Sequence, residues 1–196
     1  MSLSQTPLYR HASCSGTMVR VNGNDPRAPD KIASALICMI LQRFDFRQQP
    51  ARAILCIGSD RSTGDALGPL VGTFLSKMKL PRTLIWGTLA QPVHALNLHN
   101  YIQKIKEYSD PLLVIAVDAS LGKQDSIGLI EVVDGPLNPG AGVSKQLPPV
   151  GHFHLSGIVN LGGFMEQMVL QSTRLYHVME MARVMAKGLK KTLAAI

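Results

Sequence analysis

Two aspartates, Asp65 and Asp118, stand where a carboxylate could do chemistry. Asp118 ends one buried apolar run, and Asp65 follows another after a short polar loop. If these runs are neighbouring parallel strands, the two carboxylates meet at the sheet edge where open α/β folds bind ligands. At a separation of about 5 Å and an effective dielectric of about 20, they would repel by roughly 3 kcal/mol, or about 2 pKa units. One would then keep a proton near neutral pH while the other is ionised, as in aspartic proteases.

Each aspartate also has an ordinary structural explanation. Asp65 can cap the helix that follows it, and Asp118 can be a turn residue at the end of a strand. The presence of both aspartates favours a catalytic role over these structural explanations, because an acid follows each of two buried strands at a matched position. Asp60, in the same loop as Asp65, is expected to bond backbone groups or to line the cleft.

The stretch 53–69 positions the first aspartate. Residues 53–57 are apolar or small and end at a glycine, which predicts a strand buried on both faces. A polar loop covers 59–64, and an apolar-periodic run from 65 to about 78 predicts a helix. Pro69 must lie in the first turn of this helix, so the helix should begin near Asp65.

The rest of the chain predicts alternating helices and strands. Asp30 should cap a helix over 30–44, and Ser172 or Thr173 should cap the long terminal helix. Further expected elements are strands at 83–87, 112–118, 127–135 and 150–159, a helix over 92–110 and a helical turn at 164–170. The link before 127–135 is too short for a parallel crossover, so this strand should run antiparallel.

This element order predicts a three-layer α/β/α sandwich with a five-stranded, mostly parallel sheet that contains one antiparallel strand. We expect one domain over 30–196. Residues 1–29 should form an extended arm with at most a short strand at 17–21.

Two other chemistries are weighed against the aspartate pair. The loop has no G-x-G-x-x-G or P-loop pattern, and Asp65 would repel an anion at the helix N-terminus, which disfavours nucleotide binding. His152 and His154 form an H-x-H on an expected strand. One of them could complete a metal site with the two aspartates, or both could be hydrogen-bonded structural residues.

Composition narrows the function further. The net charge of +7 favours anionic partners. However, no RNA-binding motif, zinc-finger spacing or basic helix with aromatic platforms is present, so nucleic acid is not the expected ligand. No apolar run approaches the roughly 20 residues that cross a bilayer, and the N-terminus lacks a signal-peptide core. We therefore expect a cytoplasmic protein.

Four segments carry a family resemblance: CIGSDRSTGDALGP, GTLAQPVHALN, VIAVDASLG and DGPLNPGAGVSK, in this order. They resemble the YyaC-type sporulation proteins of spore-forming Firmicutes and are similar to the germination protease that degrades small acid-soluble spore proteins. The resemblance covers roughly 50–160, and 156–190 also fit the YyaC pattern. It implies a hydrogenase-maturation-protease-like fold.

The resemblance also implies roles for residues. In the germination protease the acids that match Asp65 and Asp118 are the catalytic pair. In the related hydrogenase maturation enzymes the matching positions and a histidine bind nickel, and His154 is the candidate for that histidine. The remaining residues expected to bind substrate are Ser59, Asp60, Gly64, His94, Pro139 and Gly140.

The resulting hypothesis is a sporulation-associated peptidase in the forespore or spore interior that needs no cofactor. Its partner would be a protein or peptide, with small acid-soluble spore proteins as candidates, and a homo-oligomer is compatible with the sequence. Two alternatives stay open. One is a metal-dependent maturation-type protease that uses Asp65, Asp118 and His154, and the other is a non-catalytic peptide-binding spore protein.

Overall fold

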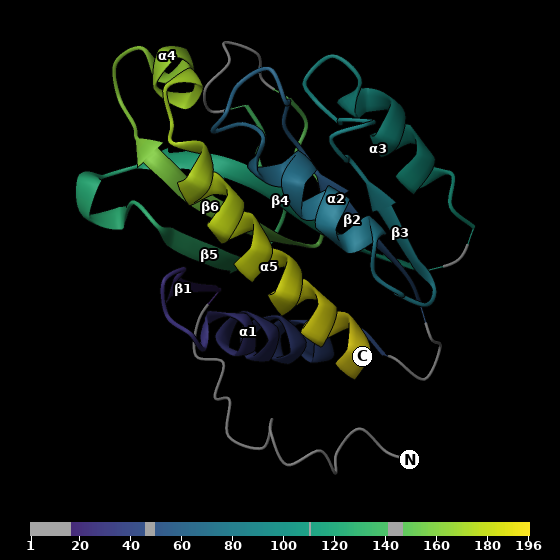
Figure 1. Cartoon of the computed structure of the whole chain (residues 1–196). Helices are drawn as coiled ribbons and strands as arrows, with labels where there is room; N and C mark the ends of the chain where they lie inside the picture. Colours follow the sequence, from purple (N-terminus) through teal and green to yellow (C-terminus); the bar gives the residue numbers. More distant parts are fainter. Residues whose placement is uncertain (1–16, 46–49, 110, 141–146) are drawn as a thin grey trace.

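The computed structural model describes residues 17–45, 50–109, 111–140 and 147–196. They form one six-stranded sheet in the order β1-β5-β6-β4-β2-β3, with helices on both faces (Figure 1). The predicted three-layer α/β/α architecture is confirmed.

Five of the six strands run in the same direction, and β5 runs against them. The pairs β2–β3, β2–β4 and β4–β6 are parallel, whereas β5 pairs antiparallel with β6, as predicted. Because β3 and β4 lie on opposite sides of β2, the order reverses between β2 and β4, and this reversal marks the ligand-binding edge of such sheets. The parallel strands are β2 (Ala51–Cys56), β3 (Thr83–Trp86), β4 (Leu112–Gly122) and β6 (Phe153–Leu161), and β5 spans Leu129–Asp134.

The sheet has six strands, so the predicted count of five is wrong. The additional strand is β1 (Met18–Asn22), which pairs antiparallel with β5 at the edge of the sheet. Val21 lies opposite Ile130 and is buried. A short strand was expected here only within the arm, because its partner lies more than a hundred residues away in the sequence.

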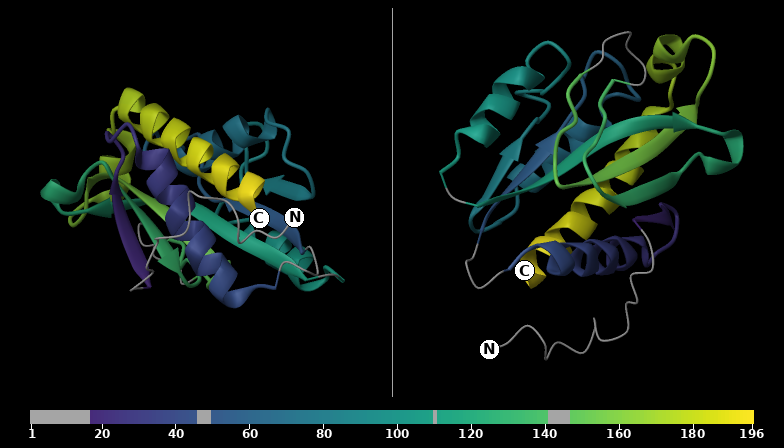
Figure 2. Two further views of the ribbon diagram at one scale, coloured as in Figure 1. Left: turned by 90° about the horizontal axis from the view of Figure 1, so that it is seen from below. Right: turned by 180° about the vertical axis from the view of Figure 1, so that it is seen from behind.

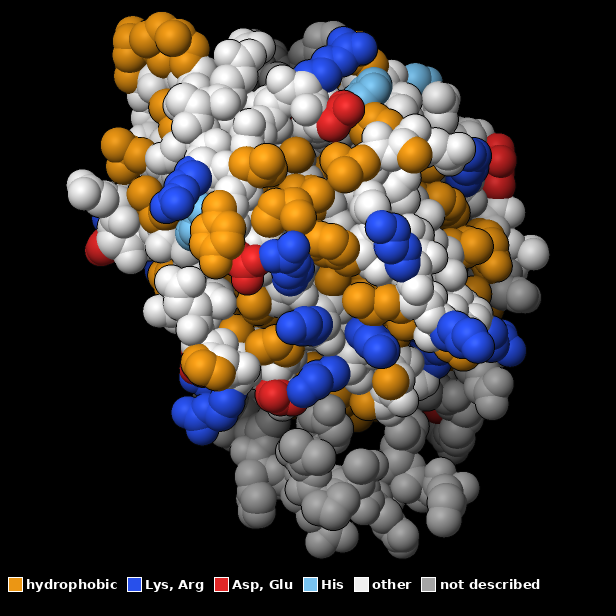
Figure 3. All heavy atoms as spheres, in the orientation of Figure 1, with side chains coloured by type: hydrophobic (Ala, Val, Ile, Leu, Met, Phe, Trp, Pro, Cys, Tyr) orange, Lys and Arg blue, Asp and Glu red, His pale blue; other side chains and the backbone are white. Residues whose placement is uncertain are grey.

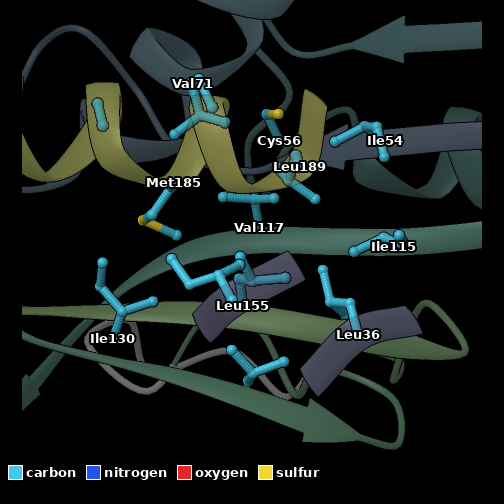
Figure 4. Close-up of a cluster of buried hydrophobic side chains, with 14 of the residues drawn as sticks. Leu36, Ile54, Cys56, Val71, Ile115, Val117, Ile130, Leu155, Met185 and Leu189 are labelled. Carbon is cyan, nitrogen blue, oxygen red and sulfur yellow. The ribbon is translucent and has the colours of Figure 1, made fainter. Parts of the chain in front are cut away.

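One face of the sheet carries α1 (Ala28–Arg43), α2 (Leu67–Ser76) and α5 (Leu175–Ala195) (Figure 2). The core between these helices and the strands is aliphatic, and Figure 4 shows Leu36, Val71 and Leu189 from the helices directed at strand residues such as Val117 and Leu155. The opposite face is covered by α3 (Leu98–Lys106) and by Leu137 and Val150, which pair with each other in an isolated bridge.

Several predicted boundaries shift. The helix expected from Pro92 begins at Leu98, because the Asn97 side chain accepts the N–H of His94 and donates to the Pro92 carbonyl, which holds a turn there. Arg27 and Arg174 precede α1 and α5, so the predicted caps at Asp30, Ser172 and Thr173 are wrong. Asp30 instead lies in the first turn of α1 and pairs with Lys191 of α5.

The surface in Figure 3 carries scattered Lys and Arg side chains over the α1–α5 face. A hydrophobic patch stands at its upper left, where Figure 1 shows α4 (Glu166–Gln171). We call Phe164, Met165 and Met168, which are 89%, 51% and 56% exposed, the α4 patch. In the part of the chain that the structure describes, no helix has both the length and the apolar character needed to span a bilayer.

Glycines let α2 approach the sheet at backbone distance. A Cβ on Gly68 would lie 2.0 Å from the carbonyl oxygen of Ile57, and a Cβ on Gly72 would lie 2.0 Å from that of Gly87. Real Cβ atoms do not come this close to backbone oxygens, so neither position accepts a side chain without moving the helix. The approach fixes the start of α2 above the end of β2.

We expect Gly68→Ala to destabilise the protein by about 1–3 kcal/mol or more, because the added methyl group overpacks the α2–β2 contact. Urea unfolding followed by circular dichroism measures the change. Ser76→Ala, at the exposed end of the same helix, is the control and should change stability by less than about 0.5 kcal/mol. Equal effects of the two substitutions would contradict this account of the packing.

Candidate functional site

A cavity of about 500 Å³ opens at the point where β2 ends beside β4. Asp65 and Asp118 both line it, so the predicted convergence of the two acids is confirmed. Its wall comes from five places in the chain: the loop between β2 and α2, β4 from Asp118 to Leu121, the segment after β5, the first half of β6, and α4.

The loop after β2 is folded tightly onto its own end, and this places Asp65. Gly58 has φ +140°, and a Cβ there would lie 2.0 Å from the Asp65 carbonyl oxygen, which also accepts the Ser59 N–H at 3.2 Å. The Asp65 side chain is partly buried at the cavity wall. Burial raises the pKa of its carboxyl, while a backbone hydrogen bond from Ser59 and the charge of His94 lower that pKa.

Asp118 lies within β4 and not at its end, because β4 stays paired with β6 as far as Gly122. On the other side of β4, the pairing with β2 ends before Asp118. The last β2–β4 pair is Cys56 with Val117, and the Ile57 N–H then donates to the Val117 carbonyl. Asp118 is therefore the first residue of β4 past the end of β2. Its side chain is only 9% exposed.

The pKa of the Asp118 carboxyl is raised well above its ordinary value. Burial is the larger cause and the charge of Asp65 the second, whereas a 2.8 Å hydrogen bond from the Ala119 N–H to Oδ1 lowers the pKa. The two acids thus have different surroundings, because Asp65 has a histidine charge nearby and is less buried. The pKa of Asp118 is thus raised further than that of Asp65, so Asp65 is the group that ionises first as pH rises.

Of the other residues predicted to bind substrate, some line the cavity and the others do not. Ser59 and Gly140 line the cavity. Asp60 is exposed, Pro139 is buried, and neither forms part of the wall. Gly64 donates its N–H to the Leu170 carbonyl at 2.8 Å and thereby ties the loop to α4.

His94 also lies outside the wall, although its charge reaches Asp65. Its Nδ1 accepts the Leu96 N–H at 3.3 Å. The residue sits in the turn before α3 and follows Val93, which bridges to Ile57 in parallel. The bridge at the end of β2 therefore also holds His94 close enough for its charge to act on Asp65.

His152 and His154 do not act together. His152 Nδ1 accepts the Val114 N–H, its ring stacks edge-on against Phe44, and it lies outside the cavity wall. His154 lines the cavity, with Nδ1 2.9 Å from the Gly135 carbonyl oxygen.

The metal alternative built on Asp65, Asp118 and His154 does not fit this geometry. Within the described ranges no three His, Cys, Asp or Glu side chains lie close enough together to hold a metal ion. We therefore derive no step through a metal.

The sequence reading missed several wall residues. Ser120 lies two residues after Asp118, so the strand period of two places both on one face of β4, and this signal was available. Ser62 stands three residues before Asp65. The residues of α4 gave no such signal, because only the fold brings them to the site. The α4 residues in the wall are Glu166, Gln167, Leu170 and Gln171.

Comparison with known proteins places this chain in a family. It belongs to the family described as "Protein of unknown function (DUF1256)", whose profile matches residues 20–188. It is 55% identical over 139 residues to a Bacillus subtilis (strain 168) protein described as "Uncharacterized protein YyaC", which covers 71% of this chain and 68% of that protein. The predicted membership of the YyaC-type family is thus confirmed.

A solved structure is also similar, the NiFe hydrogenase maturation protease HycI from Thermococcus kodakarensis KOD1. It matches with a TM-score of 0.47 and 20% identity, over 74% of this chain and 99% of that one.

Asp118→Asn should raise the stability at neutral pH. Because folding raises the pKa of this carboxyl, the folded state binds the proton more tightly than the unfolded state does. Ionising Asp118 therefore destabilises the folded state. This destabilisation is absent below the ordinary pKa of 3.8 and grows as pH rises through the folded-state pKa. An amide removes that penalty. Thermal unfolding from pH 3 to 8 should show a higher Tm for the variant at pH 7–8 and converging values near pH 3, and each 1 kcal/mol should appear as about 2–4 °C. A lower Tm at neutral pH would contradict the assignment.

Proposed function

We propose that this member of the family is a peptidase that hydrolyses peptide bonds in spore proteins with an aspartate pair. The observation that carries the proposal is the meeting of Asp65 and Asp118 in one cavity, where the charge of one raises the pKa of the other. Such a pair can offer a base and an acid at the same pH.

The reaction follows from the two protonation states. Ionised Asp65 takes a proton from water as the water oxygen bonds to the carbonyl carbon, and the electrons of the C=O bond move to its oxygen. The C–N bond then breaks, the C=O bond re-forms, and the leaving nitrogen takes the proton of Asp118. A proton that passes from Asp65 to Asp118 restores the starting state.

The substrate class rests on the resemblance to the germination protease in the segments around Asp65 and Asp118. A cavity of about 500 Å³ has room for a few residues of an extended chain. We therefore propose small acid-soluble spore proteins as the first substrates to test, in the forespore or spore interior.

Purified protein should cleave small acid-soluble spore proteins, and Asp65→Asn or Asp118→Asn should each lower kcat by at least about 10²-fold, since each removes a proton-transfer group. Gel electrophoresis and mass spectrometry of the fragments give the rate. Asp125→Asn, an exposed acid outside the cavity wall, is the matched control and should cleave normally. Cleavage that survives both substitutions would refute the aspartate mechanism.

The rate of peptide cleavage should show a bell-shaped dependence on pH. It should rise as Asp65 ionises, at a pH above 3.8 because burial raises its pKa, and should fall at higher pH as Asp118 loses its proton. Initial rates between pH 3 and 10 test this, with circular dichroism at each pH as the folding control. A rate that rises without falling up to pH 10 would argue against Asp118 as the acid.

The metal-dependent alternative is distinguished by the same assay. Cleavage by the aspartate pair is indifferent to a chelator, whereas a metal-dependent protease loses activity and regains it with added metal. A non-catalytic peptide-binding protein would bind spore proteins without turnover and would keep this binding after both aspartates are neutralised.

A further inference from the structure

Two hydroxyl groups beside the aspartates lack partners. Among the described residues, four buried side-chain polar atoms have no hydrogen-bond partner in the protein, and two of these are Ser62 Oγ and Ser120 Oγ. Both serines line the cavity that holds Asp65 and Asp118. Because buried polar atoms are normally paired, hydroxyls left over at a cavity wall point to a ligand that fills it.

The two hydroxyls are fixed to the same elements as the acids. Ser120 follows Asp118 by two residues in β4, so both side chains leave the same face of the strand. The pairing with β6 shifts register directly after Ser120, a bulge that ends this regular alternation.

On the other side of the site, the Ser62 carbonyl accepts the Ala66 N–H at 3.0 Å in the turn that contains Asp65. Each carboxyl is thus accompanied by one hydroxyl from its own segment. The third serine of the loop differs, because Ser59 Oγ accepts the Arg61 N–H at 3.2 Å and so has a partner within the protein.

The chemistry of the site indicates what these hydroxyls bind. When water adds to a peptide carbonyl and Asp65 takes its proton, negative charge develops on the carbonyl oxygen. Asp65 is engaged with the proton of the attacking water at this point, and the proton of Asp118 is needed for the leaving nitrogen. Preorganised donors at this oxygen are the largest contribution in many hydrolases, and a serine hydroxyl can donate.

We propose that the Ser62 and Ser120 hydroxyls donate hydrogen bonds to the carbonyl oxygen of the scissile bond and stabilise the oxyanion. This inference rests on the proposed peptidase function and identifies which residues touch the reacting carbonyl. In this arrangement Asp65 takes a proton from the water, Asp118 protonates the leaving nitrogen, and the two serines donate to the carbonyl oxygen.

The test combines turnover with stability of the free protein. Ser62→Ala and Ser120→Ala should each lower kcat for cleavage of a small acid-soluble spore protein by on the order of 10²-fold and raise KM only several-fold, because the hydroxyls bind the oxyanion more strongly than the uncharged carbonyl. The Tm of the free variants should stay equal or rise, because no hydrogen bond within the protein is lost. Ser120→Thr keeps the hydroxyl and should restore most of the rate, and Ser126→Ala, outside the cavity wall, is the matched control.

Binding provides a readout without turnover. In the Asp118→Asn background, isothermal calorimetry with the same spore protein should show affinity weakened several-fold by Ser62→Ala or Ser120→Ala. Cleavage that requires both aspartates but is unaffected by both alanines would overturn the inference and leave the peptidase intact. A Tm lowered by either alanine would also overturn it, because the hydroxyl then has a partner in the protein. If the unaltered chain neither binds nor cleaves spore proteins, both proposals fail.

Discussion

The close approach of backbone to backbone at the ends of β2 and β3 is the constraint on which the site depends. A Cβ on Gly87 would lie 1.8 Å from the Cys56 carbonyl oxygen, and α2 in turn approaches Gly87 and Ile57 through Gly72 and Gly68. Since no side chain separates these segments, α2 begins directly above the end of β2. The short loop between them must then hold Asp65 over the neighbouring strand β4, where Asp118 lies.

The electrostatics of the site lower the stability of the folded protein. The ion pairs that the structure describes lie at the surface, for example Arg20 with Glu131 and Arg43 with Asp134, and none of them includes Asp65 or Asp118. Burial and the charge of Asp65 both make Asp118 costly to ionise, and no ion pair among the described residues offsets that cost. Such an arrangement is retained in proteins mainly where it serves function.

Much of this arrangement could be predicted because it rests on local patterns. The uncharged runs 53–57 and 112–117 indicated buried parallel strands, and the rule for reversal of strand order predicted that the acids following them meet. Contacts between residues far apart in the chain could not be predicted, because they leave no local pattern. The extension of β4 beyond Asp118 depends on pairing with β6, the position of β1 depends on β5, and the α4 wall reaches the cavity from a hundred residues beyond Asp65.

The attachment of α4 to the rest of the domain affects how a substrate can reach the cavity. This two-turn helix buries none of its residues, and it is held by the Gly64 N–H on the Leu170 carbonyl and by Asn160 Nδ2, which contacts both the Val169 carbonyl and Thr173 Oγ1. Besides these hydrogen bonds, α4 is attached through Leu170, which packs against the core. Because so little of α4 is buried, we expect this side of the cavity to open at a lower free energy than the sheet, which would admit a bulky polypeptide without global unfolding.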